Sequence, residues 1–154
     1  MLKKVCCRFV ASLLTLALVV ACANTTQTGP VLDTKSAMAG RLVDKLGIKV
    51  SGLRLSSAGY MLDFRYRVID PEKAAPLMDF KVKPFMLVES TGARLDVPDT
   101  PKLGLLRQRP RNNSVAVKDH DYFIMFSNLG RRLKPGDEVS IVVGDTVIEH
   151  LNIQ

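Results

Sequence analysis

Side chains alternate in character along residues 60–69, and this alternation constrains the fold more than any other part of the chain. In an extended backbone, one face of this segment is apolar and aromatic, whereas the other is mainly charged, with Asp63, Arg65 and Arg67. A period of two predicts a β-strand with one face on a core and one in water. The apolar face comprises Tyr60, Leu62, Phe64, Tyr66 and Val68.

Short strands are predicted along most of the remaining chain. Residues 122–127 (YFIMFS) are almost continuously apolar, which predicts a central strand buried on both faces. Residues 107–119 are expected to form an exposed loop, and Gly144-Asp145 a two-residue hairpin connection. The other predicted strands cover residues 48–55, 81–89, 94–97, 102–106, 139–143 and 147–153.

Seven to eight short strands within residues 48–154 are typical of an immunoglobulin-like antiparallel β-sandwich. The segment L-x-P-G-D-x-V at Leu133 to Val139 resembles the turn that enters a late strand in such modules. The cysteine–tryptophan–cysteine core of true immunoglobulin domains is absent, because the chain has no tryptophan. A small β-barrel is the alternative. Residues 33–47 are expected to form a short helix or extension ahead of the sandwich.

The first 22 residues have the layout of a secretory signal. Lys3, Lys4 and Arg8 precede an apolar run over residues 9–20, which is too short for a membrane span of about 20 residues. The run ends in Leu-Val-Val-Ala-Cys, which resembles the bacterial lipobox. This resemblance implies that residues 1–21 are a lipoprotein signal peptide and that Cys22 carries a diacylglyceryl lipid.

Other interpretations of the cleavage site remain open. Ala21-Cys22-Ala23 also fits the small-x-small pattern of ordinary signal cleavage, which would release a free protein. An uncleaved anchor is disfavoured by the short apolar run. With lipidation, Ala23 in place of aspartate favours the outer membrane, facing the periplasm. Residues 22–32 are then the lipidated N-terminus and a flexible linker.

The charge and the cysteine content of the chain limit the classes of function that it can have. Removal of residues 1–21 takes away Lys3, Lys4 and Arg8, so the 22 basic residues become 19 against 15 acidic ones and the net charge falls from +7 to +4. This charge gives little support for nucleic-acid binding, but it allows attraction to anionic lipid or lipopolysaccharide phosphates. Cys6 and Cys7 leave with the signal and Cys22 would carry the lipid, so the mature chain has no free thiol for a cysteine nucleophile or a zinc ribbon.

No motif for catalysis stands out, and we expect neither enzymatic activity nor a cofactor. No serine lies in a nucleophile-elbow pattern, and glycine-rich phosphate loops are missing. His120 lies between Asp119 and Asp121, and His150 follows Glu149. Either could contribute to a metal or acid–base site, but a polar strand entrance explains His120 more simply.

Periplasmic copper handling is the alternative function. Thioether ligands suit Cu(I), and methionines occur without a His-x-Met or Met-x-x-Met spacing. Methionine is more often a gap-filling core residue. The side chains considered are His120, His150, Met61, Met78, Met86 and Met125.

A basic loop is the best candidate for a binding surface. Arg107, Arg109 and Arg111 alternate with Gln108 and Pro110, so in an extended backbone their guanidinium groups project to the same side. Such a row can hold phosphates or acidic groups through paired hydrogen bonds. Lys102 and Lys118 flank it, and Arg131, Arg132 and Lys134 form a second basic cluster. The sequence thus predicts a membrane-tethered, non-catalytic binding or assembly module that meets another envelope protein or an anionic surface.

Overall fold

The computed structural model describes residues 41–110 and 115–154, all of which belong to the compact unit Leu32–Gln154. The signal peptide, Cys22, the linker, most of the expected N-terminal helix and Arg111 lie outside the described residues. Within the described ranges, no helix combines the length and the hydropathy needed to cross a membrane.

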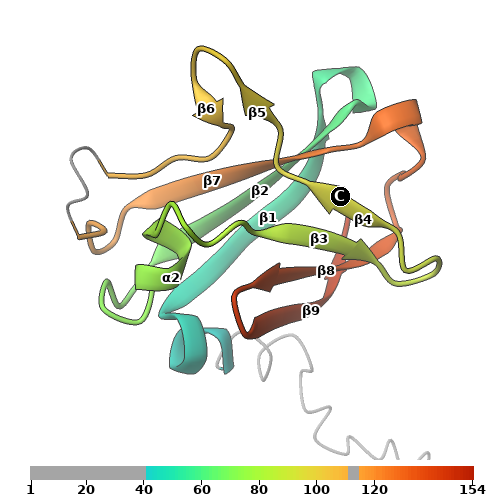
Figure 1. Cartoon of the computed structure of the whole chain (residues 1–154). Helices are drawn as coiled ribbons and strands as arrows, with labels where there is room; N and C mark the ends of the chain where they lie inside the picture. Colours follow the sequence, from blue (N-terminus) through green and yellow to red (C-terminus); the bar gives the residue numbers. More distant parts are fainter. Residues whose placement is uncertain (1–40, 111–114) are drawn as a thin grey trace, which may run out of the picture. The chain divides into compact units, whose positions relative to one another are not determined.

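Antiparallel β-strands dominate this unit (Figure 1). The helical pieces are short: residues 41–46, the single turn α2 (Ala75–Met78), and two 3-10 turns, η1 (Ser57–Gly59) and η3 (Leu129–Arg131). The strands are β1 (Ile48–Ser56), β2 (Met61–Val68), β3 (Phe85–Val88), β4 (Arg94–Asp96), β5 (Asp99–Thr100), β6 (Gly104–Leu105), β7 (Asp121–Ser127), β8 (Glu138–Val143) and β9 (Thr146–Asn152).

The strands form two larger sheets and one small ribbon. One sheet has the order β1-β2-β7, the second has the order β4-β3-β8-β9, and β5 pairs with β6. The larger sheets share a single hydrophobic core and do not close into a barrel. This division of seven longer strands between two antiparallel sheets confirms the predicted sandwich.

The alternation in residues 60–69 places β2 as expected over Met61–Val68, but Tyr60, expected on the apolar face, precedes the strand and is exposed. Leu62, Phe64, Tyr66 and Val68 are fully buried, whereas Arg65 and Arg67 are exposed. Because β2 lies between β1 and β7, its inward side chains have neighbours on both sides. The Tyr66 ring stacks on Phe64 at 5.6 Å and on Tyr122 of β7 at 6.0 Å. Each such aromatic pair adds about 1 kcal/mol to the burial of its surface.

Residues 122–127 form a strand, but the prediction that this strand is central and buried on both faces is wrong. Among the named strands, β7 is the last of its sheet rather than a central one, and residues 106–108 pair along part of its other edge. Its inward residues Tyr122, Ile124 and Phe126 are buried, but Phe123 and Met125 are only half-buried on the opposite face. The apolar run therefore predicts a strand at these residues correctly, but it does not predict the position of that strand in the sheet.

Gly47 connects the N-terminal helical residues to β1. It has a φ of +58°, and its carbonyl oxygen accepts hydrogen bonds from the backbone N–H groups of Ile69 and Asp70. A Cβ atom at this position would lie 2.5 Å from the carbonyl oxygen of Asp70. Only glycine fits both the left-handed backbone and this close approach.

We therefore expect Gly47→Ala to lower the free energy of unfolding by about 3 kcal/mol, from backbone strain plus the steric clash. Gly92→Ala is the matched control, because Gly92 has a φ of +66° with open space around it. The control should lose only about 1 kcal/mol. Urea denaturation followed by circular dichroism measures both, and equal losses would show that the contact with Asp70 is unimportant.

Candidate functional site

Arg107 is buried, which corrects its expected place in an exposed row. Its Nη2 donates to the carbonyl oxygen of Asp79 at 2.7 Å, and its Nη1 lies 3.5 Å from the carbonyl oxygen of Leu77. These carbonyls belong to the last turn of α2 and the residue after it. Burial lowers the pKa of the guanidinium, and the positive charge of Arg109 lowers it further. Arg107 therefore fastens α2 to the sandwich.

The backbone around Arg107 explains this burial. Residues 106–108 run beside β7: the Met125 N–H donates to the Leu106 carbonyl, and the Gln108 N–H donates to the Phe123 carbonyl. Arg107 itself forms a bridge with Ile124, an inward residue of β7. The Arg107 side chain is thereby directed inward, beneath α2, so residues 106–108 are an added sheet segment rather than part of an exposed loop.

Tyr66 lies in the same buried region. Burial raises the pKa of its phenol well above the ordinary value, although the charge of Arg107 lowers it. Neither the Tyr66 hydroxyl nor the Arg107 Nε has a hydrogen-bond partner among the described residues. The neighbouring Tyr122 differs, because its hydroxyl accepts a hydrogen bond from the Val117 N–H at 2.9 Å.

Arg109 is exposed, two residues further along the chain, and lines a groove beside α2. The groove has a volume of about 350 Å³. The charged groups that line it are Arg109, Glu72 and Asp79. Its remaining walls are apolar: Pro71, Ala75, Met78, Phe80, Pro110, Val115 and Ala116.

The other residues of the predicted basic surface do not join this groove. Lys102 is exposed in the turn between β5 and β6, and Lys118 is exposed shortly before β7. Of the predicted set, Arg109 is the described residue that lines the groove. A binding role for Lys102, Arg109 and Lys118 stays a prediction, and Arg111 lies outside the described residues.

Sequence reasoning missed the groove because its walls come from two separate segments. The sequence predicts only a loop or a single helical turn over residues 71–79. Nothing local indicates that Arg109, Pro110, Val115 and Ala116 line a groove with this segment. The available signal was Phe80, an aromatic residue between Asp79 and Lys81 in a polar stretch. Its side chain is 52% exposed.

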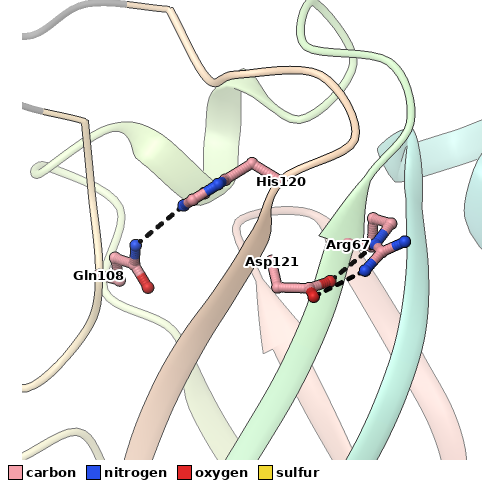
Figure 2. Close-up of polar contacts among 4 residues, drawn as sticks. All are labelled: Arg67, Gln108, His120 and Asp121. Carbon is pink, nitrogen blue, oxygen red and sulfur yellow. Dashed lines mark hydrogen bonds and ion pairs between the residues drawn. The ribbon is translucent and has the colours of Figure 1, made fainter.

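Polar contacts organise the end of β7 at which His120 lies (Figure 2). Both carboxylate oxygens of Asp121 accept hydrogen bonds from the Arg67 guanidinium, each at 2.8 Å. The hydrogen bond from Arg67 lowers the pKa of Asp121. His120 Nε2 lies 3.3 Å from the Gln108 side-chain nitrogen, and its ring meets the Tyr122 ring edge-on. Asp121 is thus committed to Arg67 rather than to His120.

His150 lies on the other large sheet, in β9. Its Nδ1 is 2.7 Å from a Glu138 carboxylate oxygen, and its φ is +55°. The register of β8 and β9 shifts here, so that Ser140 faces both Glu149 and His150 across a β-bulge. The Ser140 hydroxyl donates to the Glu89 carboxylate. The two histidines are therefore on separate sheets.

The residues of the copper hypothesis are also spread over the fold. Met86 is fully buried in β3, whereas Met61 and Met125 are half-buried on β2 and β7, and Met78 is half-buried in α2. Among the residues that the structure describes, no group of three or more histidine, cysteine or acidic side chains is placed to hold a metal ion. Copper handling remains a hypothesis from the sequence.

No family model, curated protein or solved structure matches this chain. The groove beside α2 and its charged lining are the features of the described residues best suited to recognition.

We expect Arg107→Met to lower the free energy of unfolding by about 2 kcal/mol, because the carbonyl oxygens of Leu77 and Asp79 lose their buried donor. Arg109→Met, the matched control, should stay within about 0.5 kcal/mol of the wild type, as is usual for an exposed side chain. Urea denaturation of both variants tests this difference. Similar free energies for the two variants would show that the Arg107 guanidinium does not hold α2 in place.

Proposed function

We propose that this protein is a lipid-anchored, non-catalytic module of the bacterial cell envelope that binds another envelope protein. The sequence supports the anchor: a signal-like segment ends in a lipobox-like motif at Cys22. A diacylglyceryl group supplies two acyl chains, which is enough for stable attachment to a membrane. We place the module at the outer membrane, facing the periplasm, because alanine follows Cys22.

The groove beside α2 is the observation that carries the binding role. It combines an apolar centre with charged side chains, as protein–protein interfaces do. Phe80 supplies an exposed aromatic ring, and Arg109 an exposed guanidinium of the kind enriched at interfaces. Arg107 holds α2 from below, so one wall of the groove is fixed before a partner arrives. A preformed wall lowers the entropy cost of binding.

The charges of the groove favour a protein partner over an anionic surface. Among the described lining residues, Glu72 and Asp79 stand beside Arg109, so two carboxylates accompany one guanidinium. Lipid phosphates are repelled by such carboxylates at close range. A polypeptide can instead place apolar side chains in the centre and match charges of both signs at the edge.

The anchor is tested by labelling cells with a palmitate analogue. We expect the label on the wild-type chain and on Cys7→Ser, whose substitution lies within the removed signal, but not on Cys22→Ser. The reason is that only the thiol at the lipobox position accepts the diacylglyceryl group. An unlabelled wild-type chain that washes out as a free periplasmic protein would contradict the anchor.

The groove is tested by in-cell crosslinking with a photoreactive phenylalanine analogue at Phe80. We expect a discrete crosslinked envelope protein from Phe80, and none from the same analogue at Val147, which is exposed on β9. With the captured protein purified, Phe80→Ser should raise its Kd about tenfold, because loss of a central aromatic residue commonly costs more than 1 kcal/mol. Val147→Ser should leave the Kd unchanged.

Two results would overturn the binding proposal. The first is equal crosslinking from Phe80 and Val147, which would indicate random collision. The second is a stoichiometric, sub-micromolar copper site in titrations of the purified protein with Cu(I) and Cu(II), which would favour metal handling.

A further inference from the structure

Two turns meet at the end of the β1-β2-β7 sheet where β1 leads into β2. Met61 at the start of β2 pairs with Ser127 at the end of β7, so η1 and the segment after β7 lie side by side, at the right of Figure 1. We call the exposed aromatic, leucine and basic residues of these turns the tip. They are Tyr60, Leu129, Arg131, Arg132 and Lys134.

Asn128 joins the two turns and is almost completely buried. Its Nδ2 donates to the carbonyl oxygens of Gly59 at 2.8 Å and Leu133 at 3.1 Å, and its Oδ1 accepts from the Leu133 N–H. Its backbone N–H donates to the Tyr60 carbonyl. The hydrogen bonds of this one buried asparagine therefore hold together the two turns that carry the tip residues.

The apolar side chains of the tip are directed into solvent. Leu129 is 75% exposed and Tyr60 is 53% exposed. The adjoining backbone takes the left-handed conformation at Ala58 and Arg131, with φ values of 54° and 52°. Non-glycine residues seldom adopt this conformation, and it persists where the surrounding contacts enforce it. Leu129 and Tyr60 are therefore held out from turns whose backbone conformation is enforced by the surrounding contacts.

The tip is also strongly basic. Arg131, Arg132 and Lys134 are exposed, and none of them forms an ion pair with a described carboxylate. Three other arginines on the described surface do form such pairs: Arg65 with Asp63, Arg67 with Asp121 and Arg94 with Asp96. The Arg131 guanidinium lies 5.8 Å from the centre of the Tyr60 ring, so charge and aromatic surface are adjacent.

We propose that the tip contacts the surface of an anionic lipid bilayer. Tyrosine prefers the headgroup level, where its ring is shielded and its hydroxyl stays hydrated. Leu129 can enter the upper acyl region, while Arg131, Arg132 and Lys134 lie near the lipid phosphates. Each of these basic side chains strengthens the attraction to an anionic membrane. This surface is distinct from the groove, and its role does not depend on the groove having a partner.

The proposed lipid anchor does not prevent this contact. β1 runs from Ile48 to the tip over nine residues, about 30 Å. Residues 23–40 follow the proposed anchor residue, and 18 residues can extend to at most about 60 Å. The chain is thus long enough for the tip to reach the bilayer that holds Cys22.

The absence of tryptophan from the chain allows a direct test. Leu129→Trp places a single fluorophore at the tip, and Leu103→Trp is the matched control, because Leu103 is 78% exposed in the β5–β6 turn. The full chain is reconstituted into vesicles of phosphatidylcholine alone or with one third phosphatidylglycerol. Circular dichroism and thermal melting verify that each variant is folded.

We expect Leu129→Trp to emit at shorter wavelength, and to be quenched by brominated acyl chains, in the anionic vesicles only. Leu103→Trp should respond in neither, although the same N-terminal segment brings it close to the bilayer. Adding Arg131→Asn, Arg132→Ser and Lys134→Ser to Leu129→Trp should abolish the shift, because the electrostatic attraction is lost.

Three outcomes would overturn the proposal. Emission from Leu129→Trp that is the same in both kinds of vesicle excludes recognition of anionic lipid. Equal responses at Leu129 and Leu103 mean that the tip has no special contact. A shift caused by an acidic protein but by no vesicle assigns the tip to a protein partner instead. None of these results bears on crosslinking at Phe80, so the two proposals fail separately.

Discussion

The stacking of aromatic side chains along β2 is the interaction on which the rest of the structure depends. Phe64, Tyr66 and Tyr122 form a continuous buried stack across β2 and β7, and the second sheet closes over it. The described residues of the domain contain no cysteine, so the fold rests on this packing without a disulfide. Both ends of β2 then carry the segments proposed here for recognition.

Arg107 extends this core toward the surface. Placing a charged guanidinium under α2 costs solvation free energy, and the two backbone carbonyls offset part of that cost. In return, a helical turn of four residues, too short to be stable alone, is held in the wall of the groove that Arg109, Pro110, Val115 and Ala116 also line. The groove thus depends on a buried basic residue, Arg107, whereas Arg109, two residues later, is exposed on its lining.

Local periodicity was enough to predict β2, its buried face and the two-residue connection between β8 and β9. It failed where position in the fold decides the outcome. The apolar run of β7 does not distinguish an outer strand from a central one, because Phe123 and Met125 are apolar in either case. The inward direction of the Arg107 side chain follows from the pairing of residues 106–108 with β7, and its carbonyl acceptors lie in and after α2, about 30 residues earlier. The groove depends on the same long-range contacts. Such contacts leave no mark in the spacing of nearby residues.

The β-bulge at Glu149 and His150 affects how copies of the domain can associate with one another. β9 is the last strand of its sheet, and an unpaired strand edge can recruit the same strand of another molecule. The extra residue in the bulge and the left-handed backbone of His150 interrupt the regular row of hydrogen-bonding groups along that edge. This irregular border disfavours the addition of a strand from a second copy of the domain, even at high protein concentration.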